Sequence, residues 1–269
     1  MVNEAERKRW SDERFVASWP KRERFTDRVI PHVVASLQLG PGDKVLDIGP
    51  GGGKLSLAIA PRVAPRGTVT GADISDGMVR MATARADEAK AKNVTFMVAD
   101  VQVDKVPGGP FDAATSQFGV MFFEDPVGAF SNIRAQLKRG GRLAFACWQP
   151  MAKNRWFPAA AIGPFLPPPQ PLPPGKAPTG PFALGDPKYT RGILERAGFA
   201  AVNRRAKTIV AWEPAESVAD PGFIRGQGVP QERLPEAEAA LDRHFAQFPQ
   251  KDGRFRFELN IQLWTARNP

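Results

Sequence analysis

The stretch Val45-Leu46-Asp47-Ile48-Gly49-Pro50-Gly51-Gly52-Gly53 decides the fold. It begins as an apolar run interrupted by one carboxylate and ends in glycines, which is the pattern of a buried strand that enters a tight loop. Glycines let the backbone turn sharply and approach a ligand closely. We expect a helix over 54–63 and a second strand over 68–73, so the stretch opens a βαβ unit.

The alternation of strands and helices continues beyond this unit. The further predicted elements are a helix from Ser75 or Asp76 to about Lys92, strands over 94–98, 111–117 and 142–148, and a helix that starts at Pro126, runs to Leu137 and Lys138 and stops at Gly140-Gly141. This spacing favours an α/β fold with an open, mostly parallel sheet and helices on both faces. We assign residues 40–150 to this core.

The flanking segments differ from the core. Residues 1–39 predict a helical cap of two helices, over 3–17 and 22–37, separated by Pro20. Residues 164–181 hold nine prolines, which exclude a helix interior or a central strand. We assign 151–186 to a Pro-rich, lid-like loop, with a substrate lid weighed equally against a surface strap or a flexible segment.

Regular patterns return over 187–269, which we assign to the C-terminal part of the sheet. We expect a helix over 187–197, a strand over 201–212, a helical insertion in two pieces over 215–248, and a last strand over 254–265. The strict alternation of apolar residues in the last strand suits an antiparallel neighbour.

Composition narrows the class of protein. The 269 residues carry 37 Lys and Arg against 28 Asp and Glu, a net charge of +9 that is spread along the chain rather than gathered in a basic arm. No apolar run is long enough to span a bilayer, the first ten residues are charged, and the single cysteine, Cys147, rules out an internal disulfide and a multi-cysteine metal site. We expect a cytoplasmic enzyme or binding protein without a metal.

The glycine loop points to a nucleotide-like ligand. Asp73 follows the loop by twenty residues, at the end of the next strand, where a carboxylate can bind a ribose diol. A dinucleotide fingerprint would need glycine in place of Lys54. The loop therefore fits a ligand that lacks phosphate, such as S-adenosylmethionine.

At these motifs the sequence resembles the class I S-adenosylmethionine-dependent methyltransferases, in particular the bacterial small-molecule branch similar to the ubiquinone and menaquinone biosynthesis C-methyltransferases. The matching segments are VLDIGPGGG at 45–53, GADISDGMV at 71–79, FMVADVQ at 96–102, FDAATSQFGVMFFEDP at 111–126 and LKRGGRLAFACW at 137–148. The resemblance implies a Rossmann-like seven-stranded methyltransferase sheet whose last strand is antiparallel.

The resemblance also implies which residues bind the cofactor. Asp47 and the glycines would surround the methionine moiety, Asp73 the ribose, Ile74, Met78, Asp100 and Val101 the adenine, and Gln117 and Phe118 the sulfonium. The implied cofactor-binding set is Asp47, Gly49, Gly51, Gly53, Asp73, Ile74, Met78, Asp100, Val101, Gln117 and Phe118. Two positions depart from the family pattern, since Pro50 stands for a commoner cysteine and Gln117 for a frequent arginine.

The implied function is methyl transfer from S-adenosylmethionine to a small-molecule acceptor at O, N or C, with S-adenosylhomocysteine as product. The catalytic residues stay unknown, because positioning can supply much of the rate and a base is needed only if the acceptor must lose a proton. Two alternatives stay open: an RNA methyltransferase, suggested by the net charge, and a non-methylating S-adenosylmethionine-binding protein. We expect a small-molecule substrate rather than nucleic acid, and the oligomeric state, a homodimer included, is left open.

Overall fold

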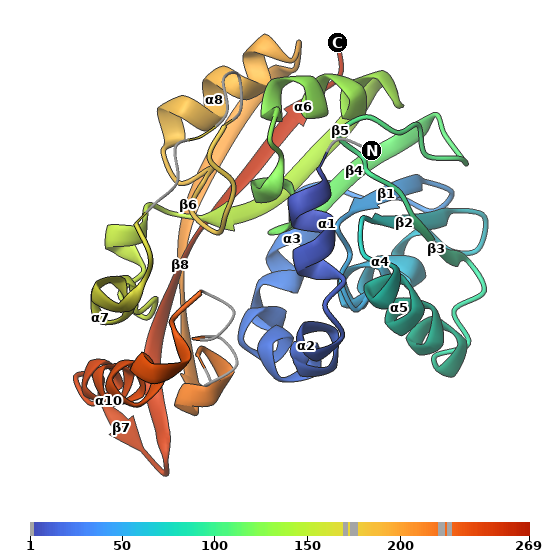
Figure 1. The fold of residues 1–269 in the computed structure, drawn as a ribbon. Helices are drawn as coiled ribbons and strands as arrows, with labels where there is room; N and C mark the ends of the chain where they lie inside the picture. The colour runs from blue at the N-terminus through green and yellow to red at the C-terminus, as the bar shows by residue number, and fades with distance from the viewer. Residues whose placement is uncertain (1–2, 169–171, 173–176, 220–223, 225–227) are drawn as a thin grey trace.

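One mixed sheet forms the centre of the molecule (Figure 1). The computed structural model describes residues 3–168, 172, 177–219, 224 and 228–269. The strands follow the order β3-β2-β1-β4-β5-β8-β6, and the short β7 pairs with β8. Their bounds are β1 Lys44–Ile48, β2 Thr68–Asp73, β3 Val94–Val98, β4 Phe111–Gln117, β5 Leu137–Trp148, β6 Ala200–Glu213, β7 Gln250–Lys251 and β8 Arg254–Arg267.

The first five strands are parallel, and β8 runs antiparallel to both β5 and β6. The α/β fold class and the antiparallel last strand predicted from the sequence are thus confirmed, with β7 as an addition to the seven strands expected. The chain adds β2 and then β3 outward from β1 and afterwards returns to place β4 on the other side of β1, so the order reverses between β1 and β4. In open α/β sheets ligands bind beside such a switch point, at the carboxyl ends of the strands.

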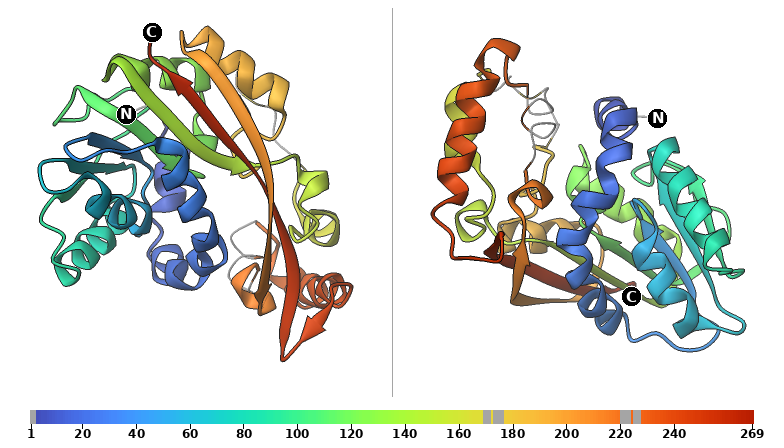
Figure 2. Two further views of the ribbon diagram at one scale, coloured as in Figure 1. Left: turned by 180° about the vertical axis from the view of Figure 1, so that it is seen from behind. Right: turned by 90° about the horizontal axis from the view of Figure 1, so that it is seen from below.

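Helices cover both faces of the sheet (Figure 2). One face carries α3 (Ile30–Leu37), α4 (Lys54–Val63) and α5 (Asp76–Glu88), and the other carries α6 (Pro126–Ala135) and α8 (Pro187–Arg196). The long strands β6 and β8 extend past this layer toward α7 (Ala159–Ile162) and α10 (Leu234–Phe245), which contact each other (Figure 1). Short 3-10 turns, among them η1 (Asp27–Val29), η2 (Gly119–Phe122), η3 (Met151–Lys153), η4 (Gly163–Phe165), η5 (Ala215–Ser217) and η6 (Gln231–Arg233), connect the elements.

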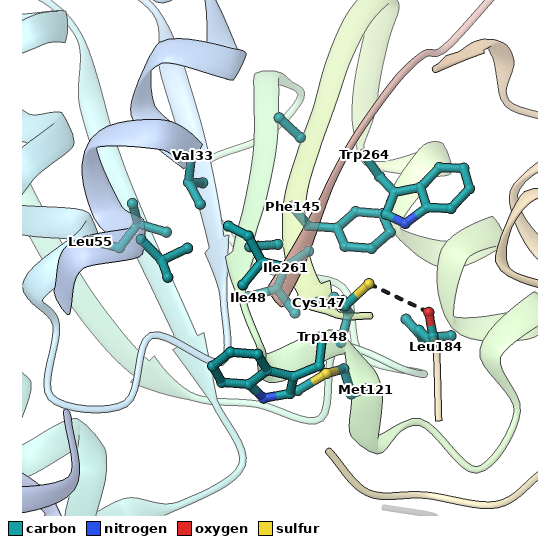
Figure 3. Packing of buried hydrophobic residues seen from close by; sticks show 14 of the residues in the cluster. Val33, Ile48, Leu55, Met121, Phe145, Cys147, Trp148, Leu184, Ile261 and Trp264 are labelled. Atoms are coloured by element: carbon teal, nitrogen blue, oxygen red, sulfur yellow. Dashed lines mark hydrogen bonds between the residues drawn. The ribbon is translucent and has the colours of Figure 1, made fainter. Parts of the chain in front are cut away.

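The middle of the sheet is a dry apolar core (Figure 3). Phe145 and Cys147 of β5 and Ile261 and Trp264 of β8 are almost completely inaccessible to solvent. The Cys147 thiol donates to the carbonyl oxygen of Leu184 at 3.5 Å, and burial raises its pKa. Cys147 is therefore a packing residue and not a nucleophile at neutral pH.

The N-terminal segment corrects one sequence prediction. Instead of two helices divided at Pro20, the described residues form α1 (Glu4–Trp10), α2 (Glu13–Thr26) and α3, and Pro20 lies inside α2. The break falls at Ser11, because Asp12 caps α2 by accepting a hydrogen bond from the Phe15 amide at 2.9 Å. An interior proline costs a helix roughly 3 kcal/mol, and here the contacts of α2 with the glycine loop described below oppose that cost.

A second correction concerns the helix that starts at Pro126. It ends at Ala135 rather than at Lys138, and Leu137 already pairs with Phe111 as the first residue of β5. The ladder shifts register between Phe111 and Ala113, so Gly140-Gly141 lie in an irregular part of the strand, and Gly140 has a positive φ of 75°. The glycines permit an irregularity in a strand instead of terminating a helix.

The insertion predicted as two helical pieces over 215–248 is described only in part. Its second piece is α10, whereas the first begins as the single turn η5. Residues 220–223 and 225–227 of this prediction, and 169–171 and 173–176 of the Pro-rich loop, lie outside the described residues.

Candidate active site

A cavity of about 260 Å³ opens at the carboxyl ends of the parallel strands. Asp47 comes from the end of β1, Asp73 from β2, Asp100 from the segment after β3, and Gln117 from β4. Ten of the eleven residues implied by the resemblance line it: Asp47, Gly49, Gly51, Asp73, Ile74, Met78, Asp100, Val101, Gln117 and Phe118. The eleventh, Gly53, does not, because it faces Phe96 and Ala82 instead.

The glycine loop owes its shape to backbone conformations that other residues rarely adopt. Gly49, Gly51 and Gly53 have φ values of 62°, 52° and 83°. A side chain at Gly49 would also lie 3.0 Å from the Cα of Gly119, so this residue lets the β1 and β4 loops touch. Gly53 is the N-cap of α4, and no side chain caps that helix.

Asp73 and Asp47 form the buried acidic floor of the cavity. Asp73 accepts hydrogen bonds from the amides of Gly51 at 3.0 Å and Ser75 at 2.9 Å, and burial raises its pKa despite them. Asp47 accepts from the Ser56 hydroxyl at 2.6 Å. Burial, with a smaller contribution from the charge of Asp73, raises the pKa of Asp47 to about 7. Bringing these carboxylates together is costly unless a ligand supplies opposite charge.

Asp100 is distant from the glycine loop in sequence, yet it lines the same cavity. Its two carboxylate oxygens accept from the amides of Gln102 at 3.1 Å and Asn3 at 3.3 Å. The apolar residues Ile74, Met78 and Val101 complete this part of the lining. This combination of flat apolar wall and carboxylate suits a planar base with an amino group.

Gln117 and Phe118 lie where β4 ends. The Gln117 amide donates to the carbonyl oxygen of Thr26 at 3.0 Å. Phe118 has a positive φ of 69°, rare for a bulky residue, and its ring stacks on Trp148 at 4.2 Å with the planes only 13° apart. Backbone strain of this kind tends to occur at functional sites, where the surrounding structure holds it in place.

Sequence reasoning missed several lining residues on the N-terminal helices. From the sequence alone, the aromatic residues Trp10, Phe15 and Trp19 could either roof the site or simply pack in the core, and the structure places Trp10 and Trp19 in the lining. The sequence did not single out Asn3, Glu6 or Glu23, and only Trp19 and Glu23 at helical spacing could have hinted at a shared face. The lining also includes Trp148, which was read only as the end of a strand.

The charge of the cavity is opposite to that of the chain. Six acidic residues line it, Glu6, Glu23, Asp27, Asp47, Asp73 and Asp100, against one basic residue, Lys54. Four residues of the lining also carry a buried polar atom without a hydrogen-bond partner in the described structure: Asn3 Oδ1, Trp19 Nε1, Asp47 Oδ1 and Gln117 Oε1. Buried polar groups are nearly always paired, so this set indicates a place for a polar, cationic ligand.

Three residue types that often serve as bases or nucleophiles, histidine, tyrosine and cysteine, do not line the cavity. The histidines His32 and His244, the tyrosine Tyr189 and the cysteine Cys147 are absent from the lining. Among the described residues no cluster of His, Cys, Asp and Glu could hold a metal ion, and no helix is long and apolar enough to cross a membrane.

Comparison with known proteins agrees with this geometry. Residues 45–141 match the family model described as a methyltransferase domain. This part of the chain is therefore similar to a methyltransferase domain. The match covers the glycine loop, Asp73, Asp100 and Gln117 and ends within β5. The resemblance inferred from the sequence is therefore confirmed.

Two curated relatives match this part of the chain. The aklanonic acid methyltransferase of Streptomyces sp. (strain C5) is 37% identical over 127 residues, which are 47% of this chain and 54% of that protein. A ubiquinone/menaquinone biosynthesis C-methyltransferase of Ectopseudomonas mendocina is 38% identical over 104 residues, 38% of this chain and 41% of that protein. The chain thus spans about half the length of these relatives.

Solved structures share the fold over most of the chain. The YcgJ protein from Bacillus subtilis superposes with a TM-score of 0.61 at 18% identity, covering 89% of this chain and 97% of that one. The [4+2]-cyclase SpnF superposes with a TM-score of 0.55 at 20% identity, covering 90% of this chain and 80% of that one. At such low identity these likenesses establish the fold and not the reaction.

Proposed function

We propose that this protein transfers the methyl group of S-adenosylmethionine to a small-molecule acceptor. In this reaction the bond between sulfur and the methyl carbon breaks, a bond from the acceptor to that carbon forms, and the sulfonium becomes the neutral thioether of S-adenosylhomocysteine. The observation that carries the proposal is the acidic cavity at the switch point of a methyltransferase domain. A cationic ligand matches six carboxylates far better than a pyrophosphate would.

The residues of the cavity fit the cofactor. Asp47 has one carboxylate oxygen without a partner, beside the loop where the ammonium group of the methionyl end would lie. The two oxygens of Asp73 accept from the amides of Gly51 and Ser75, and a carboxylate oxygen has a second lone pair that can accept from a ribose hydroxyl. Asp100, with Ile74, Met78 and Val101, would hold the adenine, and Gln117 and Phe118 would lie near the sulfonium. When bound, the cofactor supplies an activated methyl group.

The acceptor would meet the apolar part of the cavity. Ile30, Met121, Phe118 and Trp148 line it, and the last two present stacked rings. This favours a small acceptor that is partly apolar or aromatic. These side chains would act by orienting the acceptor and excluding water.

We also propose that the chain divides into a cap (1–39), a core (40–150), a lid-like loop (151–186) and a C-terminal part (187–269), and that the loop acts as a lid of the cavity. The end of the Pro-rich segment packs beside the cavity: Thr179 donates to Glu6 at 2.7 Å and the Gly180 amide to the carbonyl oxygen of Met121 at 3.2 Å. Pro181 belongs to the lining. These contacts favour the interpretation of the segment as a lid and not as a surface strap remote from the site.

The two alternatives make different demands on the site. An RNA substrate needs a basic channel, whereas the lining here is acidic. A non-methylating protein would bind the same cofactor, and the fold shared with a [4+2]-cyclase shows that the architecture alone does not exclude another reaction.

Calorimetric titration tests the proposal first, with S-adenosylmethionine, S-adenosylhomocysteine and NAD titrated in parallel. We expect micromolar binding of the first two and none of NAD. Transfer of a labelled methyl group to a panel of phenols, quinones and amines then tests the reaction. Binding of NAD alone would overturn the cofactor assignment, and cofactor binding without transfer to any acceptor would favour the non-methylating alternative.

A further inference from the structure

Helix α2 is held directly against the glycine loop. Arg85 donates to both carboxylate oxygens of Glu23, at 2.6 and 2.9 Å, and its Nη1 also donates to the carbonyl oxygen of Gly52 at 2.9 Å. Lys54, the residue after the loop, lies 3.2 Å from Glu23. One turn earlier in α2, Trp19 covers Gly51 so closely that a Cβ there would lie 2.8 Å from the indole ring.

This arrangement leaves a hydrogen-bond donor beside the loop with no acceptor. Trp19 Nε1 is buried and has no partner among the described residues, whereas the indole of Trp10 donates to Glu6 at 2.9 Å. The N-terminus of α4 at this place is also open, because the helix starts without a side-chain cap and without an acidic residue in its first turn. A buried N–H group next to an uncapped helix N-terminus is suited to a carboxylate.

In the described structure, Asn3, beside Asp100, carries an unpaired acceptor where Trp19 carries an unpaired donor. Its side chain is 4% exposed, its backbone amide donates to Asp100 at 3.3 Å, and its Nδ2 donates to the carbonyl oxygen of Phe122 at 2.9 Å. The remaining atom, Oδ1, is a buried acceptor without a donor. The hydroxyl of Ser75 also donates to the carbonyl oxygen of Trp10 at 2.8 Å, which fixes α1 next to the β2 loop.

We propose that the N-terminal helices supply two contacts to the cofactor: Trp19 Nε1 donates to the carboxylate of its methionyl end, and Asn3 Oδ1 accepts from the adenine amino group. The inference rests on the proposed function and adds to it, since it makes the helices part of the cofactor site rather than a cover for the acceptor alone. Both atoms gain a partner when the ligand is bound, so the ligand stabilises the packing of α1 and α2 against the glycine loop and the β2 loop.

Trp19→Phe tests the first contact, because it keeps an aromatic ring over Gly51 and removes only the indole N–H. We expect the variant to bind S-adenosylhomocysteine about tenfold more weakly, as for loss of a hydrogen bond to a charged group. Its affinity for 5′-methylthioadenosine, which has no carboxylate, should stay within about twofold of the wild type. Trp212→Phe, at an exposed position of β6, controls for the loss of a tryptophan.

Asn3→Ala tests the second contact with a second ligand pair. The wild type should prefer S-adenosylhomocysteine over S-inosylhomocysteine, which lacks the amino group, and the variant should lose several-fold of this preference. Circular dichroism checks that both variants are folded. Equal loss of both ligands in a pair, or unchanged affinity for S-adenosylhomocysteine, would overturn the contact concerned. Failure of the wild type to bind either nucleoside would instead overturn the proposed function.

Discussion

Asp47→Asn should stabilise the protein relative to the wild type as the pH rises. Asp47 is fully buried, and one of its oxygens has no hydrogen-bond partner in the described structure. Burial, aided by the nearby charge of Asp73 and opposed by Ser56, raises its pKa from 3.8 to about 7. A carboxyl whose pKa is higher in the folded state contributes stability that is complete below the unfolded pKa and is lost as the pH rises through the folded pKa.

The pKa shift gives the size of this effect. A rise of about three units corresponds to roughly 4 kcal/mol, at 1.36 kcal/mol per unit. Because the unfolded carboxyl ionises from about pH 3.8 upward, roughly 1.7 kcal/mol of this is already lost at pH 5, which leaves about 2.5 kcal/mol to be lost between pH 5 and pH 8.5. Asparagine does not titrate, and its local packing effect is the same at both pH values, so it cancels in the difference.

Urea denaturation of the ligand-free protein at pH 5 and pH 8.5 measures the difference. The free energy of unfolding of Asp47→Asn minus that of the wild type should increase by about 2.5 kcal/mol between the two conditions. Asp242→Asn, which removes an exposed carboxylate from α10, should follow the wild type. If the Asp47→Asn and wild-type curves run parallel within about 0.5 kcal/mol, the carboxyl does not titrate as its burial requires.

Three further variants address the site. Asp73→Ala should weaken S-adenosylmethionine binding by about 1.5–3 kcal/mol through lost charged hydrogen bonds, and an unchanged Kd in calorimetry of a folded variant would contradict this role. Gly51→Ala should lower the free energy of unfolding by about 1–3 kcal/mol, because Gly51 has a positive φ and a Cβ there would clash with Trp19. Gly140 also has a positive φ but lies in open space, so the smaller loss expected for Gly140→Ala measures the backbone strain alone. Trp148→Phe should raise KM for the acceptor several-fold in a steady-state assay while the Kd of S-adenosylhomocysteine stays within about twofold, and a parallel loss of both would place Trp148 on the cofactor.

The parts of the fold that the sequence predicted best are those fixed by local signals. Strands 94–98 and 111–117 and the helix over 54–63 have the predicted bounds, because apolar runs end at glycine, proline or aspartate within the same short window. Pro20 misled the prediction because its effect is local, whereas α2 is stabilised by Arg85 and Lys54, which are distant in sequence. Gly140-Gly141 misled it because a glycine pair permits both a helix end and an irregular strand, and only the pairing with β4 decides.

The candidate site also combines residues that the sequence could predict with residues that it could not. Residues at the ends of strands could be predicted, because the carboxyl ends of parallel strands meet at one edge of a sheet, and ten of the eleven implied positions line one cavity. The contributions of Asn3, Glu6 and Glu23 could not, since polar residues on a surface helix look alike whether they face water or a cavity. Their roles, like those of the other lining residues, stay predictions until ligand binding is measured.

The net charge of +9 kept an RNA substrate open as an alternative, and the cavity shows why net charge is a weak argument about the site. Its carboxylates are dispersed between Glu6 and Asp100, so no segment of the sequence is acidic, and only the topology of the sheet and the docking of α1 and α2 gather them. Net charge governs long-range attraction, which salt screens, whereas charges that line a cavity act on a bound ligand at short range, where salt screens them less. A protein with a net positive charge can therefore hold an acidic site.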